Sequence, residues 1–298
     1  MSNETRSVFV AITGRPNVGK SSLLNRLVGE KAAIVTPKPQ TTRTRITGIL
    51  TQGPVQYVFL DTPGIHKPKN SLGKQMERTT AGVVAEGDVT LMLFDPVAPL
   101  RPVETEMINA LGQGGHAIAA INKVDTISDL PTLAAKRDEL EAFGVFKQIH
   151  AISALTGDGC EGLLEDLSHY ASPGPHFFAD DIYTDQPEKQ LVAEIVREKL
   201  LLHLQEEIPH GTAVEVERFH EREGGCVIDI DVTIYCERKT HKGMIIGKGG
   251  AMLKQIAMEA RQDCEAFLGA KVFLQCWVKV REGWRGNDNM VNRMGFGR

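Results

Sequence analysis

The stretch that most restricts the fold lies near the start of the sequence, where the apolar run VFVAIT at 8–13 leads directly into GRPNVGKS at 14–21. An apolar run that ends in the pattern GxxxxGK[ST] predicts a buried strand, a glycine-rich loop and the first turn of a helix. Backbone N–H groups in such a loop, with the positive end of the helix, can hold phosphate. The sequence therefore predicts an α/β fold with a phosphate loop at the end of its first strand.

Four more apolar runs follow this pattern, and each ends where a polar motif begins. They are VQYVFL (55–60), VTLMLFD (89–95), HAIAAI (116–121) and QIHAI (148–152). Runs of this length, separated by helical segments, are typical of buried parallel strands with crossover helices. We therefore expect a mostly parallel sheet flanked by helices, with the polar motifs at the carboxyl ends of its strands, where such sheets bind ligands.

The chain of 298 residues is long enough for two domains, and its composition changes at 171–190, a segment with three prolines and several acidic residues. We expect a first domain over 1–175, a linker over 176–190 and a smaller α+β domain over 191–298. The elements expected in this second part are a helix from about Glu188 to Glu206, strands at 211–220 and 225–237, a helix with apolar residues from Leu253 to Leu268, and a strand at 271–280.

Several features argue against secreted and membrane-spanning classes of protein. No run approaches the ~18 apolar residues that a membrane helix needs, and the start MSNETRSVFVAIT is too polar for a signal peptide. The five cysteines show neither CxxC spacing nor histidine partners at zinc-like intervals. Cys226 and Cys236 share the parity of the apolar residues between them, which predicts that both lie on the buried face of one strand. We expect a cytoplasmic protein.

The charge is divided unevenly along the chain. From residue 236 to the end there are twelve Lys and Arg against six Asp and Glu, a net charge of +6, so the rest carries −10 of the total of −4. A basic module on an acidic body favours a polyanionic partner for the tail.

The first polar motifs contain the groups that bind the phosphates of a nucleotide. Lys20 can reach the β- and γ-phosphates, and the Ser21 hydroxyl can bind Mg²⁺. Asp61 of DTPG ends a strand and can hold the same metal through water, and the Gly64 N–H can sense the γ-phosphate. These residues predict a magnesium–nucleotide site.

The loop TTRTR (41–45) offers a further metal ligand. Loops in this position become ordered around Mg²⁺ and the third phosphate, and a threonine hydroxyl is a suitable ligand. We expect Thr42 rather than Thr41 to provide it. The predicted magnesium set is therefore Ser21, Thr42 and Asp61.

The motif NKVD (122–125) predicts that the base is guanine. Asp125 can accept two hydrogen bonds from the guanine N1–H and amino group, a donor pair that adenine lacks. Lys123 would lie along the base, Asn122 would tie the base loop to the phosphate loop, and the Ala154 N–H would lie near the guanine oxygen. With these motifs in order, the first domain resembles the translation-factor-related class of small GTPases. The predicted GTP-binding set is Gly14, Arg15, Pro16, Asn17, Val18, Gly19, Lys20, Ser21, Ser22, Asp61, Thr62, Pro63, Gly64, Ile65, Asn122, Lys123, Val124, Asp125, Ser153, Ala154 and Leu155.

Residue 65 raises the question of how the attacking water is oriented. Many GTPases have a glutamine after the DxxG glycine, whereas Ile65 cannot form a side-chain hydrogen bond, so slow intrinsic hydrolysis is expected. The chain resembles GTPases that combine an asparagine at the position of Asn17 with an apolar residue after DxxG, and this resemblance implies a potassium ion. Arg43 and His66 are the alternatives. The predicted catalytic residues are Asn17, Lys20, Thr42 and Gly64.

A second glycine-rich stretch, GMIIGKGG at 243–250, has no Ser or Thr after Lys248 to hold a metal. GKGG instead fits the GxxG turn of a KH domain, which clamps about four single-stranded nucleotides. A helix–turn–helix connection is the alternative for this turn alone, but the order helix, strand, strand, GxxG, helix, strand matches the prokaryotic (type II) KH fold. Lys239 adds to the positive charge here. The predicted RNA-binding set is Arg238, Lys242, Gly247, Lys248, Gly249, Gly250 and Lys254.

Taken over nearly its whole length, the chain resembles the Era family of ribosome-assembly GTPases. The motifs that carry the resemblance are GRPNVGKSSLLNRLVG, PQTTRTRI, DTPGIHKP, NKVD, LVAEIVREKLL, KGMIIGKGG and VREGWRGN. The resemblance implies binding of GTP or GDP with Mg²⁺, binding of the 3′ end of small-subunit (16S) ribosomal RNA, and a role in assembly and maturation of the 30S subunit. It also implies a monomer, loosely associated with the cytoplasmic face of the inner membrane. Ser22 and Thr44 depart from the residues common in the family, but neither is a required group.

Two other functions remain open on the residues alone. One is a regulatory switch independent of RNA, whose basic tail binds a protein or an anionic membrane. The other is a GTPase tied to RNA modification, for which the sequence offers no cysteine pair, cofactor loop or pair of catalytic carboxylates outside the GTP site.

Overall fold

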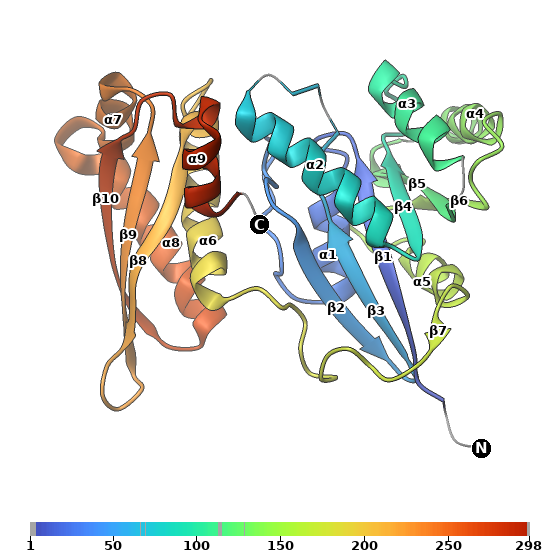
Figure 1. Cartoon of the computed structure of the whole chain (residues 1–298), viewed down its shortest axis with the longest axis horizontal. Helices are drawn as coiled ribbons and strands as arrows, with labels where there is room; N and C mark the ends of the chain where they lie inside the picture. Colours follow the sequence, from blue (N-terminus) through green and yellow to red (C-terminus); the bar gives the residue numbers. More distant parts are fainter. Residues whose placement is uncertain (1–3, 66, 69, 113–114, 128, 297–298) are drawn as a thin grey trace. The chain divides into compact units, whose positions relative to one another are not determined.

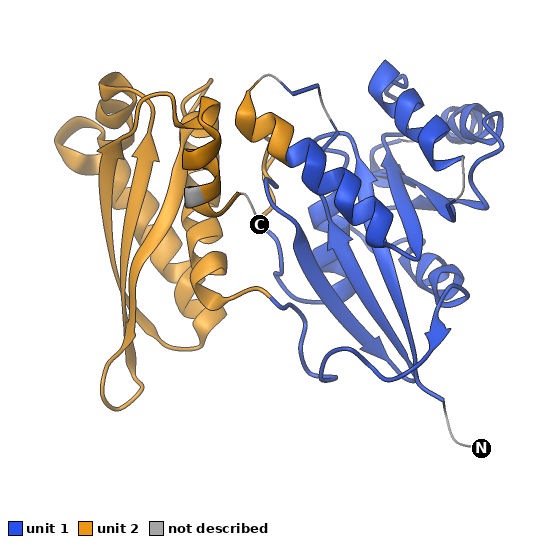
Figure 2. Cartoon of the chain, viewed as in Figure 1, with its two compact units in different colours: residues 1–33, 42–68, 76–185 blue, residues 34–41, 69–75, 186–298 orange. Residues whose placement is uncertain are grey.

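The computed structural model of the chain describes residues 4–65, 67–68, 70–112, 115–127 and 129–296. The chain forms two compact units (Figure 2). The first consists of residues 1–33, 42–68 and 76–185, and the second of residues 34–41, 69–75 and 186–298. The chain thus passes to the second unit after Asp185, within the linker expected at 176–190, and two early segments also belong to that unit. The domain limits expected from the sequence stay a prediction.

Within the described residues, the first unit contains a seven-stranded sheet with the order β2-β3-β1-β4-β5-β6, and β7 pairs with β1 (Figure 1). The strands are β1 (Arg6–Gly14), β2 (Ile46–Gln52), β3 (Val55–Asp61), β4 (Val89–Phe94), β5 (Ala117–Asn122), β6 (Gln148–Ile152) and β7 (Ser172–Pro173). The pairs from β3 through β1 and β4 to β6 are parallel, whereas β2 and β7 run antiparallel to their neighbours. The sheet is mostly parallel, as the apolar runs predict.

The helices of the first unit cover both faces of this sheet. They are α1 (Lys20–Val28), α2 (Ser71–Glu86), α3 (Pro102–Leu111), α4 (Leu130–Glu141) and α5 (Cys160–Ser168), of which α2 has its first residues, 71–75, in the second unit. Alternate residues of β1 point to opposite faces: Val10 and Ile12 pack with α1 and α5, whereas Ala11 packs with Val83 of α2. On the side of Ala11, α3 and α4 cover β4 and β5. Burial on both faces explains why the central strands are continuous apolar runs.

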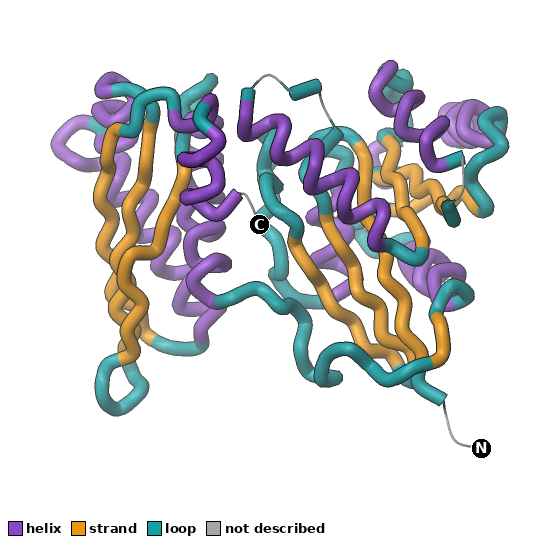
Figure 3. Tube along the Cα trace, viewed as in Figure 1, coloured by secondary structure: helices purple, strands orange, loops and turns teal. Residues whose placement is uncertain are grey.

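The second unit contains, among its described residues, a three-stranded sheet with the order β10-β9-β8 (Figure 3). The central strand β9 runs antiparallel to β8 and parallel to β10. The elements are α6 (Glu188–His203), β8 (Ala213–Glu221), β9 (Val227–Cys236), α7 (Lys239–Ile246), α8 (Ala251–Leu268), β10 (Lys271–Val280) and α9 (Asp288–Val291). The buried residues of β9 form one core with α6 and α8. This unit is α+β, as predicted.

The segment after β10 is fixed to the rest of the second unit. Trp284 is fully buried, and its indole N–H donates to the Gly211 carbonyl at 3.0 Å. The guanidinium of Arg285 donates to the Glu237 carboxylate at 2.5 Å. These contacts explain why the late motif VREGWRGN is structured rather than a loose tail.

Among the described residues, no helix is both long enough and apolar enough to cross a membrane.

Candidate functional site

The phosphate loop leaves β1 in a conformation that depends on its glycines. Gly14 and Gly19 have φ of 142° and 99°, and a Cβ on Gly14 would lie 2.6 Å from the Leu93 carbonyl oxygen. Asn17 also has a positive φ of 63°, and its carbonyl accepts a hydrogen bond from the Lys123 ammonium at 2.7 Å. The loop is thus shaped by close backbone packing and tied to the end of β5.

Three oxygen atoms from separate segments lie together beside this loop. The Ser21 hydroxyl lies 2.6 Å from Oδ2 of Asp61 and 2.9 Å from the Thr42 hydroxyl, which is 3.4 Å from the same carboxylate oxygen. Thr41 is engaged elsewhere, because its hydroxyl donates to the Lys38 carbonyl at 2.7 Å. The structure therefore brings together the three predicted magnesium ligands.

The charged groups of this site are deeply buried. Burial lowers the pKa of the Lys20 ammonium to about 8, and the Asp61 carboxylate opposes this shift. Burial also raises the pKa of the Asp61 carboxyl, against the opposing effects of Lys20 and the hydroxyls of Ser21 and Thr42. Oδ1 of Asp61 has no hydrogen-bond partner among the described residues. A buried carboxylate oxygen in need of a partner, beside two hydroxyls, fits Mg²⁺ and its water ligands.

The DTPG loop is held against the phosphate loop. The Ile65 N–H donates to the Gly14 carbonyl at 3.0 Å, and a Cβ on Gly64 would lie 2.7 Å from the Pro16 nitrogen. The Ile65 side chain packs against the apolar cluster around Met92 and Phe94. It therefore contributes to packing and offers no group that could orient water. His66, an alternative for that role, lies outside the described residues.

The base motifs at the ends of β5 and β6 are linked through Asn122. This buried amide donates to the Val18 carbonyl at 2.8 Å and accepts from the Ala154 N–H at 2.9 Å. The Ala154 N–H, which is predicted to lie near the guanine oxygen, is thus hydrogen-bonded to Asn122 in this structure. Asp125 is exposed, and its Oδ1 accepts from the Ser153 hydroxyl at 2.5 Å. Asn122 therefore ties the base loops to the phosphate loop, as its position in NKVD predicts.

Two residues near these loops are not predicted from the sequence. Asp95, directly after β4, lies 3.6 Å from the Arg15 guanidinium and 3.7 Å from the Lys123 ammonium. Arg26 of α1 donates to the carbonyls of Ala154, at 3.1 Å, and Leu155. Asp95 could have been found, since it is a polar residue ending a buried strand. Nothing in the local sequence around Arg26 indicates its partners, which are about 130 positions away.

The GKGG turn joins α7 to α8 in the second unit. Gly247, Gly249 and Gly250 all have positive φ, at 73°, 60° and 82°. A Cβ on Gly247 would lie 2.7 Å from the Met252 Cβ, whereas one on Gly249 would meet no atom within 4 Å. Gly247 is therefore required by the packing of the turn itself, and Gly249 faces open space.

Cationic side chains occur in this turn and in the helices on either side of it. Lys248 at its tip is exposed, as is Lys254 in the first turn of α8. No ion pair joins any of these cations to a carboxylate within the described part of the chain. The cations are Arg238, Lys239, Lys242, Lys248 and Lys254. Their charge is therefore available to an anionic ligand.

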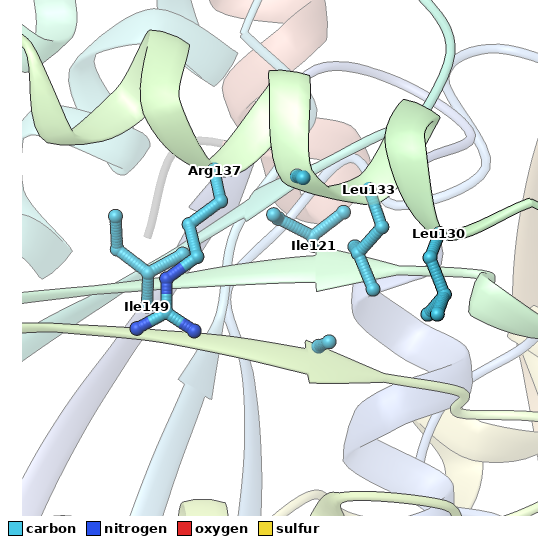
Figure 4. Close-up of a pocket in the computed structure, with 7 residues that line it drawn as sticks. Ile121, Leu130, Leu133, Arg137 and Ile149 are labelled. Carbon is cyan, nitrogen blue, oxygen red and sulfur yellow. The ribbon is translucent and has the colours of Figure 1, made fainter.

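A cleft in the first unit, between α4 and the edge of the sheet, is separate from these motifs (Figure 4). Its labelled side chains are apolar except for Arg137, whose guanidinium is paired with Glu141 at 2.8 Å. None of the predicted site residues lines it, so it is not part of the nucleotide site.

Comparisons with known proteins agree with this division of the chain. A family described as 50S ribosome-binding GTPase matches residues 9–123, and a KH domain family matches residues 207–285. The GTPase Era of Alkaliphilus oremlandii is 46% identical over 292 residues, which cover 98% of this chain and 99% of that protein. The GTPase Era of Caldanaerobacter subterraneus subsp. tengcongensis is 47% identical over 298 residues, covering 98% of each.

Two solved structures are similar over almost all of the chain. One is Era in complex with MgGDPNP and nucleotides 1506–1542 of 16S ribosomal RNA, with 36% identity, a TM-score of 0.95 and coverage of 99% of this chain and 100% of that one. The other is a variant of Aquifex aeolicus Era bound to GDP and AlF4⁻, with 36% identity, a TM-score of 0.94 and the same coverage. These likenesses confirm the predicted fold class. The chain belongs to the Era family of GTPases, and it hydrolyses GTP in a domain that is followed by an RNA-binding KH domain.

Proposed function

We propose that this protein binds the 3′-terminal region of small-subunit ribosomal RNA through its KH turn and takes part in maturation of the 30S subunit, with GTP hydrolysis as its switch. The observation that carries the RNA proposal is the group of cations around GKGG that lack carboxylate partners among the described residues. The likeness to an Era structure that contains 16S ribosomal RNA supports this choice of RNA.

In the nucleotide site, each predicted residue has a distinct role. Lys20 and the N–H groups of the loop from Gly14 to Ser22 hold the phosphates, and Gly64 responds to the third phosphate. Ser21, Thr42 and Asp61 hold Mg²⁺, which offsets the negative charge on the phosphate oxygens. The proximity of these three oxygens in the structure supports the assignment.

At the base, Asp125 reads guanine, with Lys123 along the ring. Val124, Ser153 and Leu155 complete the loops around it. The exposure of Asp125 and its hydrogen bond from Ser153 support this role, because one carboxylate oxygen is oriented while the side chain stays accessible to a base.

For hydrolysis, we infer that Asn17 helps to bind a potassium ion beside the phosphates. Asn17 is exposed on the phosphate loop, whereas the Ile65 side chain is directed into an apolar cluster. Arg43, the competing source of positive charge, is buried and 2% exposed. A monovalent cation at Asn17 would add positive charge to that of Lys20, because the other cation of this loop, Arg15, lies 3.6 Å from the Asp95 carboxylate.

We also propose that the protein is a cytoplasmic monomer that associates loosely with the inner surface of the membrane. The basic surface of the second unit supports both RNA binding and attraction to anionic lipid headgroups. The RNA proposal takes precedence because the KH order of elements and the GxxG turn match a known mode of RNA binding.

The test is the double variant Lys248→Asp/Gly249→Asp. Gly249 has open space around it and a φ that aspartate tolerates, so the fold should survive. Binding of a single-stranded RNA with the 3′-terminal sequence of 16S ribosomal RNA should fall by at least tenfold, with a shallower salt dependence, while GDP affinity should not change.

A matched control is Lys271→Asp/Gly224→Asp, which makes the same charge change elsewhere in the second unit. Lys271 is exposed, and Gly224 is a positive-φ glycine with no atom within 4 Å of a Cβ. This control should bind the RNA within about threefold of the unaltered protein. Equal RNA affinity in the two folded double variants would refute the KH proposal.

A further inference from the structure

Residues 34–41, which precede Thr42, belong to the second unit (Figure 2). Within this unit they are hydrogen-bonded to α6. The Val35 N–H donates to the Glu198 carboxylate at 3.0 Å. The Lys38 ammonium donates to the Leu204 carbonyl, at the end of α6. Two residues of the α6 region, more than 160 positions later in the chain, thus hold the beginning and the middle of this segment.

Arg197 of α6 holds the end of the same segment. Its guanidinium donates to the Gln40 carbonyl at 3.5 Å and to the Thr41 carbonyl. The guanidinium is also paired with Glu194, one turn earlier in the helix. Its Nε lies 2.8 Å from Oε1, and the Nη2 that bonds the Thr41 carbonyl also donates to Oε2. The planar fork of an arginine can make all these bonds at once, whereas a lysine ammonium cannot.

The burial of Arg197 is not explained by a gain in folding stability. Its side chain is 1% exposed, and a buried ion pair contributes little net stability compared with apolar residues of similar size. A buried arginine that spans a carboxylate and two consecutive carbonyls does, however, fix the orientation of those carbonyls. Its main effect is therefore on the geometry of residues 40 and 41.

The next residue, Thr42, belongs to the metal site, so the orientation of residues 40 and 41 affects that site. The Thr41 carbonyl and the Thr42 nitrogen belong to one planar peptide group, so fixing the first orients the backbone of the second. Gln40 has a positive φ of 60°, and the Thr41 hydroxyl is 2.7 Å from that of Thr36. The segment is thus folded on itself up to the residue whose hydroxyl lies beside Ser21 and Asp61.

We propose that Arg197 is a positioning residue for Thr42: by holding the carbonyls of Gln40 and Thr41 it keeps the Thr42 hydroxyl at the metal that accompanies a nucleoside triphosphate. The inference rests on the proposed role of Thr42 as a magnesium ligand. Arg197 acts through the backbone of Gln40 and Thr41 and is not itself one of the proposed metal ligands. It favours the triphosphate over the diphosphate because loops of this kind bind the metal only when the third phosphate is present.

The decisive variant is Arg197→Met/Glu194→Met. Because both members of the buried pair are replaced by apolar residues of similar length, no unpaired charge is left behind. The ratio of GDPNP affinity to GDP affinity at saturating Mg²⁺ should fall by about tenfold, since up to two hydrogen bonds to the segment are lost. The value of kcat for GTP should fall by a similar factor, and GDP affinity should stay within twofold. A general loss of structure would instead weaken both nucleotides equally.

Three further variants make the result unambiguous. Arg197→Lys keeps the buried charge but not the fork, and should recover part of the lost ratio. Arg137→Met/Glu141→Met removes an exposed Arg–Glu pair on α4 and should leave the ratio unchanged. Thr42→Ala should lower the ratio at least as much as the Arg197 double variant.

The outcomes separate the two proposals. If Thr42→Ala leaves the ratio unchanged, the metal role of Thr42 is wrong, and the role of Arg197 falls with it. If Thr42→Ala lowers the ratio while the folded Arg197→Met/Glu194→Met protein keeps it, the metal role stands and the positioning role of Arg197 is refuted.

Discussion

Asn122→Ala is the substitution that most directly tests how the nucleotide site is held together. The amide of Asn122 is 1% exposed and makes two hydrogen bonds, to the Val18 carbonyl and from the Ala154 N–H. Alanine removes both bonds and leaves the two backbone groups without their partner at a buried position.

The expected cost follows from these two bonds. Each buried backbone group that loses its partner costs about 1–3 kcal/mol, so the free energy of unfolding of the first unit should fall by about 2–6 kcal/mol. Typical domains have only about 5–15 kcal/mol in total. GDP affinity should fall by at least tenfold, because the phosphate loop and the base loops are no longer tied to each other.

The assay is urea unfolding without nucleotide, followed by GDP titration under conditions where each variant is folded. Asn25→Ala is the matched control, because Asn25 also bonds backbone groups twice, the N–H and carbonyl of Ala33 at 2.9 and 2.8 Å. It should lose stability yet keep its GDP affinity. A loss below 1 kcal/mol for Asn122→Ala, or equal GDP affinities for the two variants, would refute the reasoning.

Three other predictions concern single groups. Asp125→Asn should shift base preference from guanine toward xanthine, because an amide can donate to the xanthine oxygen; competition between GTP and XTP measures this, and unchanged preference would exclude Asp125 as the base reader. Potassium should raise GTP hydrolysis above the rate in sodium at equal ionic strength, and Asn17→Ala should remove the difference; equal rates in the unaltered protein would count against the ion. Gly247→Ala should destabilise the second unit by about 1–3 kcal/mol more than Gly249→Ala. The new methyl group at 247 would overlap Met252, and the φ and ψ of Gly247 lie in a region that only glycine adopts readily. A lower unfolding temperature for Gly249→Ala than for Gly247→Ala would contradict the packing argument.

The strands and the loops that follow them could be predicted because both signals are local. An apolar run ending in a polar motif marks the carboxyl end of a buried strand, and Asp61 and Asn122 do lie at the ends of β3 and β5. The pattern of apolar runs does not predict β2, because its sequence ITGILTQ includes a glycine and polar residues. Pairing with β3 over seven positions compensates for that weak local preference.

The parts that could not be predicted depend on contacts between distant segments. Arg197 appears in the sequence as an ordinary charged residue of an amphipathic helix, and its buried position follows from carbonyls 156 and 157 positions earlier. The assignment of residues 34–41 to the second unit has the same origin. No spacing rule within one segment contains this information.

The prediction that Cys226 and Cys236 share a buried strand face is wrong for Cys226. β9 begins at Val227, so Cys226 lies in the preceding turn, where it is exposed. Alternation predicts which face a residue occupies only inside the strand. The positive-φ glycines at 224 and 225 belong to the turn, so the strand begins at Val227, later than the apolar residues suggest.

The buried indole of Trp284 makes this protein well suited to fluorescence measurements. The sequence contains two tryptophans, Trp277 and Trp284, and both belong to the second unit, where the first is 43% exposed and the second fully buried. Emission excited selectively from tryptophan therefore reports on the KH-containing unit alone, without labelling. GTP and GDP bind to loops that contain no tryptophan. A change in tryptophan emission when GDP replaces GTP would therefore show that the nucleotide alters the structure of the second unit.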